Sequence, residues 1–420
     1  MKGWKILKLD DLCEFKNGLW TGKKPPYQNV GVIRNTNFTK DGYLDDSDIA
    51  FLDVEIKQYA TRKLEFGDII LEKSGGGPKQ PVGRVIPFTK DCGDFSFSNF
   101  TSVVRIRDKE KIDYRYLHKI LYFFYVSGVT EPMQTHSTGI RNLQLKEYKN
   151  LSIPVPPLPE QKRIVAILDE AFEAIARAIA NTEKNLANSR EVFESYLNTI
   201  FDQKGDGWVE KKLGDIATFR NGLNFTKSSK GESIKIVGVK DFQNHFWIQE
   251  EQLDSVTIDA ELKEIDILRK GDILTVRSNG NKELIGRCVL ADNFSEKISH
   301  SGFTIRIRIE REDIYPQFIV HFLKSRELRK QLTESGGGIS ISSLNQQGLS
   351  LIIMSFPTFV EQKAIVANIN ELAIETQRLE TIYRQKLAAL KELKQSILQK
   401  AFTGELTADT PKTVKEKIAA

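Results

Sequence analysis

The amino-acid sequence contains the same unit twice, with a repeat length of about 200 residues. Residues 3–19 align without gaps on residues 207–223, an offset of 204, with nine identities in seventeen positions. The shared tripeptide Asn-Gly-Leu lies at 17–19 and again at 221–223. Further along the offset becomes 201, where Glu-Gln-Lys at 160–162 matches 361–363. A repeat this long is a duplicated domain with its connector, which predicts pseudo-twofold symmetry.

Each copy has two unlike parts. Short β-branched and aromatic runs, such as residues 68–71 and 273–276, are separated by Gly, Asn and Pro and predict mixed α+β domains. Prolines follow at 154–159 in the first copy and at 357 in the second, and uninterrupted helical sequence begins there. We therefore expect domains at 1–155 and 204–356, long helices at 156–203 and 357–403, and a tail at 404–420.

Both long helices carry apolar residues at alternating spacings of three and four, which is a heptad seam. The first seam is Leu168, Phe172, Ile175, Ile179, Thr182, Leu186, Ser189, Phe193, Tyr196 and Ile200. The second is Ile369, Leu372, Thr376, Leu379, Tyr383, Lys386, Leu390, Leu393 and Ile397, with Lys386 as a misfit. Each helix could pack on its own domain. The seam and the symmetry favour an antiparallel coiled-coil spacer that separates the two domains.

Composition and motifs argue against several classes of protein. The net charge of +5 allows a polyanionic partner but does not require one. No segment has the apolar length of a membrane span, the first ten residues lack a secretory pattern, and three scattered cysteines suit a reducing compartment, so we expect a cytoplasmic protein. Residues 18–24 miss the spacing of a phosphate-binding loop, and the five histidines lack ligand spacing. We predict no catalytic residue, no metal site and no cofactor bound by this chain.

Loops rich in Gly, Ser, Asn, Lys and Arg follow a shared Gly-Asp-Ile strand entry in both copies, and such loops suit nucleic acid. A second pair of polar loops, residues 134–141 and 335–342, precedes the long helices. If they touch bases, the two domains read different sequences, because the framework matches and the polar residues differ. The predicted DNA-binding residues are Lys73, Ser74, Gly76, Lys79, Gln80, Arg84, Thr138, Arg141, Arg277, Ser278, Asn279, Lys282, Arg287, Ser340 and Ser342.

The chain resembles the DNA specificity subunits of type I restriction-modification systems over nearly its whole length. The most specific element is residues 153–165, Ile-Pro-Val-Pro-Pro-Leu-Pro-Glu-Gln-Lys-Arg-Ile-Val, which looks like the family's junction between recognition domain and conserved helix. Residues 393–406 resemble the end of the second conserved helix. Residues 355–360 depart from the proline-rich form of the junction, which leaves the start of the second helix open.

The resemblance implies two target recognition domains on an antiparallel spacer that also docks methylase subunits, expected to be two. A restriction and translocation subunit would join that core, and S-adenosylmethionine, ATP and magnesium would bind these partners. The partner of the recognition domains would be double-stranded DNA, read as an asymmetric bipartite target. Predicted docking and spacer residues are Glu160, Gln161, Lys162, Leu168, Phe172, Ile179, Phe193, Glu361, Gln362, Lys363, Leu379, Leu390 and Ile397.

Two other hypotheses stay open from the sequence. The chain could be the reader of a related bipartite system in which methylase and nuclease are fused in one partner. It could also be a coiled-coil interaction protein whose loops bind no DNA, which salt-dependent DNA binding would exclude.

Overall fold

The computed structural model describes residues 3–19, 24–77, 80–137, 139–203, 205–242, 245–259, 261–328 and 344–408, without the side chains of His136, Ser137 and Lys282. These residues form two compact units, Met1–Thr182 with Gln385–Ala420 and Glu183–Arg384. Each unit holds one globular domain and a part of both long helices. The long helices are α5 (Leu158–Asp202) and α9 (Phe359–Thr403).

The first unit contains a globular domain built on a four-stranded antiparallel sheet in the order β2-β9-β5-β7. A second sheet, β4-β3-β8, and a third, β10-β11-β6, extend it, and β1 pairs with β12. Its strands are β1 (Lys5–Lys8), β2 (Cys13–Asn17), β3 (Tyr27–Ile33), β4 (Ala50–Glu55), β5 (Ile69–Glu72), β6 (Ser74–Gly76), β7 (Val85–Pro87), β8 (Phe95–Phe97), β9 (Thr101–Ile106), β10 (Gln134–Ser137), β11 (Ile140–Leu143) and β12 (Ser152–Val155). Its helices are α1 (Leu9–Leu12), α2 (Ile56–Arg62), α3 (Tyr114–Val126) and α4 (Leu145–Lys149).

The second unit repeats this topology. Its four-stranded sheet has the order β14-β20-β17-β18, its second sheet is β16-β15-β19, and β13 pairs with β21. The strands are β13 (Val209–Lys212), β14 (Ala217–Asn221), β15 (Ser233–Val237), β16 (Asp254–Thr257), β17 (Ile273–Val276), β18 (Cys288–Leu290), β19 (Ile298–His300), β20 (Thr304–Ile309) and β21 (Ile353–Phe356). The helices are α6 (Pro316–Lys324) and α8 (Gln346–Leu351).

Registers match as well as strand orders, which confirms that the repeat is a duplicated α+β domain. Ile69 pairs with Val104 in the first sheet, and Ile273 pairs with Ile307 in the second. In both domains the first strand of the second sheet pairs antiparallel with its successor and parallel with the strand that leads into the main sheet.

The two long helices have different N-terminal features. Pro156 and Pro157 precede α5, and Pro159 lies in its first turn, where a missing N–H is tolerated. In α9, Thr358 and Glu361 form a capping box, in which the Glu361 carboxylate accepts from Thr358 N at 2.9 Å and Thr358 Oγ1 accepts from Glu361 N at 3.4 Å. The capping box explains how α9 starts without the proline-rich junction.

Within the first unit, the core joins the domain to both long helices. The buried face of α3, with Tyr116 and Leu117, packs in one cluster with Ile164 and Leu168 of α5 and with Leu398 of α9. The Phe402 ring lies 5.7 Å from the Tyr116 ring. The end of α9 therefore belongs to the core of the first domain, although it follows the second domain in the sequence.

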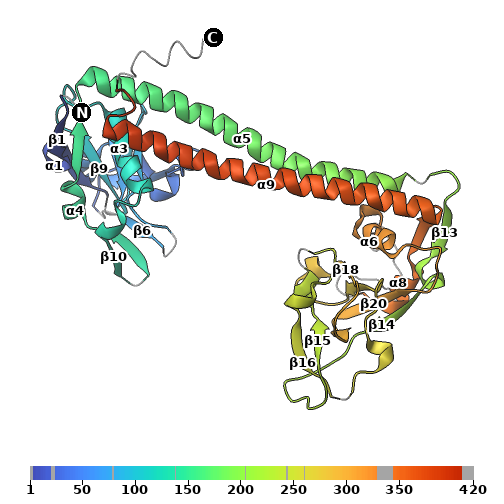
Figure 1. Ribbon diagram of the computed structural model, residues 1–420. Coiled ribbons are helices and arrows are strands. Elements are labelled where there is room, and N and C mark those ends of the chain that lie inside the picture. The colour runs from blue at the N-terminus through green and yellow to red at the C-terminus, as the bar shows by residue number, and fades with distance from the viewer. Residues whose placement is uncertain are drawn as a thin grey trace, which may run out of the picture. The chain divides into compact units, whose positions relative to one another are not determined.

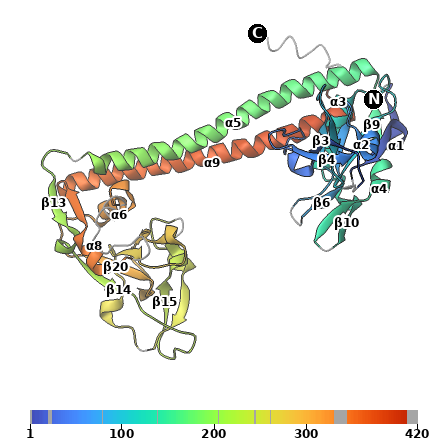
Figure 2. The same ribbon diagram turned by 180° about the vertical axis from the view of Figure 1, so that it is seen from behind.

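Within the second unit, the same relationship holds with the helices exchanged. Phe201, near the end of α5, lies 5.3 Å from Phe318 and 5.4 Å from Phe322 of α6, measured between ring centroids. Val366 and Ile369 of α9 belong to the same buried cluster. In each unit the two helix segments run antiparallel and side by side (Figures 1 and 2). The alternative in which each helix packs only on its own domain is therefore wrong.

The predicted seam of α9 needs a correction. Thr376, Tyr383, Leu390 and Ile397 are half-buried, as predicted. The alternate positions are shifted by one residue: Leu379, Lys386 and Leu393 are exposed, and Glu380, Leu387 and Lys394 are half-buried instead. Two of the shifted residues are held by polar contacts. Arg190 of α5 pairs with Glu380 at 2.8 Å in the second unit. In the first unit, Lys394 pairs with Asp41 at 2.6 Å and lies over the Phe172 ring.

The seam of α5 also changes near its end. Tyr196 is exposed and Leu197 is buried, so Leu197 and Phe201 enter the domain core in place of the predicted Tyr196. Ile200 stays partly buried against that core.

Candidate nucleic-acid interface

In the first unit, the two predicted DNA loops meet at one end of the main sheet. Strand β6, which follows Lys73, pairs with β11, and β11 pairs with β10, so residues from both loops share one small sheet. Leu143 N donates to Lys73 O at 2.8 Å and fixes the junction. Strands β6 and β10 lie on the side of this domain away from α5 and α9 (Figures 1 and 2).

The second unit has the same junction. Leu344 N donates to Arg277 O at 2.8 Å, which is the counterpart of the Leu143–Lys73 bond. The predicted residues Ser340 and Ser342 lie outside the described residues. We call Asn17, Lys73, Ser74 and Asn142 the first candidate surface, and Asn221, Arg277 and Ser278 the second. The two share a backbone frame, in which Asn17 and Ser74 recur as Asn221 and Ser278 and Lys73 is replaced by Arg277.

The first candidate surface is linked by side-chain hydrogen bonds. Lys73 Nζ donates to Asn17 Oδ1 at 2.8 Å, and Ser74 Oγ donates to Asn142 Oδ1. Partial burial lowers the pKa of Lys73. A partly desolvated ammonium gains more from an approaching phosphate than a fully hydrated one, because the local dielectric constant is lower. Sequence reasoning missed Asn17 and Asn142, although the repeated Asn-Gly-Leu tripeptide was a signal for Asn17.

The other predicted residues of the first domain have several environments. Gln80 is exposed, Gly76 is buried within β6, and Arg141 lies on β11 opposite Gly76. Lys79 and Thr138 lie outside the described residues. The guanidinium of Arg84 makes bonds within the domain. It pairs with buried Glu72 at 2.8 Å and donates to the carbonyls of Phe38 and Asn35. These bonds hold the base of the loop, and a direct DNA contact by Arg84 stays a prediction.

In the second domain, the predicted residues after β17 form a short loop with local hydrogen bonds. Asn279 Oδ1 accepts from Asn281 N at 2.8 Å, and Arg287 Nε donates to Glu283 O at 3.3 Å. Arg277, Ser278 and Asn279 are half-buried. The Lys282 side chain lies outside the described part of the chain. No finding tests base contact by these residues, which remain predictions.

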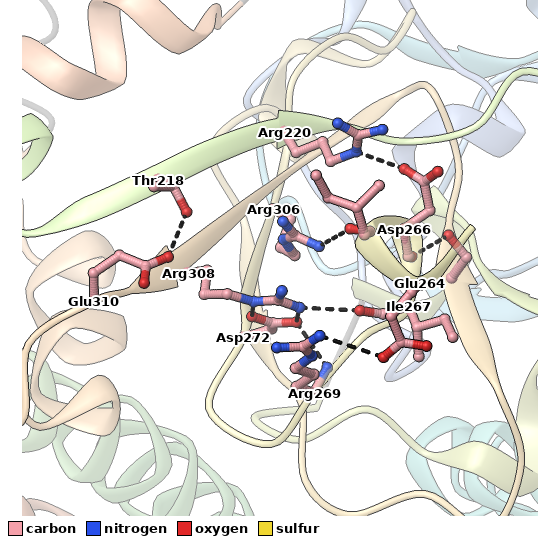
Figure 3. Close-up of polar contacts among 12 residues, drawn as sticks. Thr218, Arg220, Glu264, Asp266, Ile267, Arg269, Asp272, Arg306, Arg308 and Glu310 are labelled. Atoms are coloured by element: carbon pink, nitrogen blue, oxygen red, sulfur yellow. Dashed lines mark hydrogen bonds and ion pairs between the residues drawn. The ribbon is translucent and has the colours of Figure 1, made fainter. Parts of the chain in front are cut away.

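A cluster of arginines in the second domain serves the fold (Figure 3). Arg308 makes two hydrogen bonds of 2.7 Å to the buried carboxylate of Asp272, and Arg220 pairs with Asp266. Arg306 is buried and donates to Ile265 O at 2.7 Å, and its burial lowers its pKa. Arg105 and Asp68 make the same two bonds of 2.7 Å in the first domain. The repeated Gly-Asp-Ile strand entry is therefore explained by a structural ion pair.

Among the predicted docking residues, the two glutamines of the repeated Glu-Gln-Lys segment are buried in their own units. Gln161 accepts from Asp113 N at 2.8 Å and donates to Lys111 O and Pro156 O at 2.9 and 2.8 Å. Gln362 accepts from Tyr315 N at 2.8 Å and donates to Asp313 O and Pro357 O. Both side chains thus form a clamp between a domain and the start of its long helix, and a contact of either glutamine with a methylase subunit stays a prediction.

The remaining docking and spacer residues divide by burial. Leu168 is buried, and Phe172, Phe193 and Ile397 pack against the domain cores. Glu160, Ile179 and Leu390 are half-buried. Lys162, Glu361, Lys363 and Leu379 are exposed, and only this last group is fully available to another chain in the described structure.

No group of three or more His, Cys, Asp or Glu side chains is placed to hold a metal ion in the described part of the chain. Among the described helices, none combines the length and the apolar character of a membrane span.

Fold and site together define a protein of two related α+β domains, each carried by a pair of long helix segments and each presenting a different polar sheet end. The family model of the type I restriction modification DNA specificity domain matches residues 1–186 and 205–389. The chain belongs to this family.

Individual proteins agree with the family assignment. The type I restriction enzyme StySPI specificity subunit of Salmonella potsdam is 26% identical over 438 residues, which cover 97% of this chain and 90% of that protein. A chain solved in a study of complex assembly and conformational transition of the type I R-M system has a TM-score of 0.74 at 18% identity, covering 97% and 99% of the two chains. The HsdS subunit from Thermoanaerobacter tengcongensis has a TM-score of 0.64 at 18% identity, covering 97% and 98%. At these identities, the solved structures support the fold.

Proposed function

We propose that this chain is the DNA specificity subunit of a type I restriction-modification complex. Each domain reads one half of an asymmetric bipartite target in double-stranded DNA, and the long helices set the spacing of the halves. The observation that carries the proposal is the duplicated junction: the same backbone bond holds Lys73 in one domain and Arg277 in the other. Within these equal frames the loops differ, because Gly75 and Gly77 of the first domain correspond to Asn279 and Asn281 of the second. This difference suits two readers of different sequences, since base edges are distinguished by donor and acceptor groups.

The proposal also assigns different roles to this chain and to its partner subunits. This chain contributes recognition and no catalysis, and S-adenosylmethionine, ATP and magnesium bind to partner subunits. Two methylase subunits dock on the long helices, where Leu379 and Leu393 of α9 are exposed apolar side chains outside the seam. A restriction and translocation subunit completes the complex, which acts in the cytoplasm.

The limited base discrimination that a single domain can supply supports two DNA-reading domains on one chain. One domain has few polar side chains at its candidate surface, and a good bidentate base contact contributes about 1 to 3 kcal/mol of discrimination. Linking two readers makes the second binding event intramolecular, so their specificities combine.

The proposal is tested by mapping modified bases. The chain is co-expressed with the methylase encoded beside it, and methylated bases are read across the host genome. We expect one asymmetric split motif with methylation in both halves. A well-formed complex that methylates nothing, or a motif without a gap, would contradict the proposal.

A further inference from the structure

Each domain holds one phenylalanine in solvent next to its candidate surface. Phe100 directly precedes β9 and is 43% exposed, and Phe303 directly precedes β20 and is 62% exposed. The two residues are equivalent in the repeat, because Thr101 and Thr304 follow them as the first residues of matching strands. An exposed aromatic side chain forgoes the burial that stabilises most phenylalanines. Its presence in both copies calls for a physical explanation.

The turn that carries each phenylalanine is fixed by the same hydrogen bonds. In the first domain, Ser98 O accepts from Thr101 N at 3.0 Å and from Thr101 Oγ1 at 2.8 Å. In the second, Ser301 O accepts from Thr304 N at 2.9 Å and from Thr304 Oγ1 at 2.8 Å. Phe100 and Phe303 are therefore each held on a constrained turn, which lowers the conformational entropy that binding would cost.

The repeated Asn-Gly-Leu tripeptide supports this turn. A Cβ atom on Gly18 would lie 1.8 Å from Ser98 O, and one on Gly222 would lie 2.2 Å from Ser301 O. Only glycine lets the end of β2 or β14 approach the turn this closely. The strand end is then anchored by Leu19 N donating to Phe97 O and by Leu223 N donating to His300 O, both at 2.8 Å.

The backbone of each phenylalanine is hydrogen-bonded to the segment that carries the cation of its candidate surface. Phe100 O accepts from the backbone N–H groups of Lys73 and Ser74 at 3.0 and 3.1 Å, and Phe303 O accepts from Arg277 N at 2.9 Å. Each phenylalanine is thus joined through its backbone to the residue that carries the cation, Lys73 or Arg277. A cation can pair with a backbone phosphate, and an apolar ring can insert between stacked bases. A phenylalanine and a cation on one segment therefore suit both the phosphates and the bases of DNA.

We propose that Phe100 and Phe303 are twin wedges that insert between base pairs of the DNA, one in each half-site. The proposal rests on the proposed function and adds a mode of recognition to it. Insertion separates one base step in each half, and the neighbouring Lys73 or Arg277 holds the adjacent phosphate. Part of the specificity then comes from how easily that step opens, since flexible steps such as TA and CA open most readily.

The test uses the assembled complex with its methylase and duplexes that carry the mapped target. Phe100→Ala and Phe303→Ala should each weaken target binding about tenfold. The slope of log affinity against log salt should not change, because phenylalanine carries no charge. 2-Aminopurine is placed at one half-site position at a time, leaving the methylated adenines unlabelled. Its fluorescence should rise on binding of the wild-type complex, and each variant should abolish the rise in one half only.

Matched controls make the result specific. Phe66 is 44% exposed in the first domain and Val209 is 56% exposed in the second, so Phe66→Ala and Val209→Ala remove similar apolar surface elsewhere. Both should bind as the wild type does, and Phe100→Leu should retain part of the affinity because it keeps an apolar wedge. Unchanged binding by both phenylalanine variants would overturn the proposal. It would also be overturned if the variants failed to assemble with the methylase while the fluorescence rise on DNA binding remained. If the wild-type complex binds no bipartite target, the proposed function itself fails.

Discussion

Gln161 and Gln362 lie 201 positions apart and make the same three hydrogen bonds in their respective units. Each accepts one backbone N–H from the segment before a domain helix and donates to two backbone carbonyls. A glutamine amide provides this combination of one acceptor and two donors, whereas a glutamate provides no donor when ionised. The clamp fixes each domain on the start of its long helix.

Replacing a clamp glutamine should destabilise its unit. Gln161→Leu leaves one backbone N–H and two carbonyls without that partner in a buried site, and we expect a loss of about 2 to 4 kcal/mol in the free energy of unfolding. Gln362→Leu should behave alike. Denaturant unfolding measures the loss, with the exposed neighbour Lys162→Ala as a control that should change stability by less than about 0.5 kcal/mol. Equal effects for Gln161→Leu and Lys162→Ala would refute the clamp.

Lys73 and Arg277 should contribute phosphate contacts. Lys73→Ala and Arg277→Ala should each reduce the slope of log affinity against log salt by about one, because each contact releases counterions. Filter binding of the assembled complex at several salt concentrations measures the slope. Lys109 is exposed beyond the opposite end of β9, so Lys109→Ala is the matched control. A Lys73 variant with the slope of the control would place Lys73 away from the phosphates.

Stability should fall in acid because three histidines, His118, His300 and His321, are buried. Burial lowers the pKa of His118 to about 3 and that of His321 to about 4, from an ordinary value of 6.5. Below pH 6.5 the unfolded chain takes up protons that the folded chain cannot, so stability is full above pH 6.5 and is lost as the pH falls towards 4. His118→Gln with His321→Gln should flatten the dependence of the unfolding midpoint on pH between 7 and 4. An unchanged pH dependence would show that other groups govern it.

The sequence predicted the duplication, the α+β domains and the long helices, because repeats and heptad spacings can be recognised from the order of residues alone. It placed the α9 seam one residue off at every second position, because Leu379 and Leu393 are more apolar than Glu380 and Lys394, whose ion pairs with Arg190 and Asp41 the sequence does not show. The misfit of Lys386 next to the apolar Leu387 was the one signal of the shift. It also assigned Gln161 to a partner, since nothing in the sequence shows that the backbone near Asp113 folds back onto it. Phe100 was missed because a phenylalanine before a strand usually belongs to a core.

The central claim is that the long helices set the spacing of two DNA-reading domains. Shortening both helices tests it most directly. Deleting seven residues from Glu183 in α5 and seven from Thr381 in α9 keeps both seams in register and shortens each helix by about 10 Å. Modified bases are then mapped beside the wild type. We predict the same two half-site sequences with a gap shorter by about three base pairs, at about 3.4 Å for each pair. An active shortened complex that methylates the wild-type motif with its original gap would contradict the account.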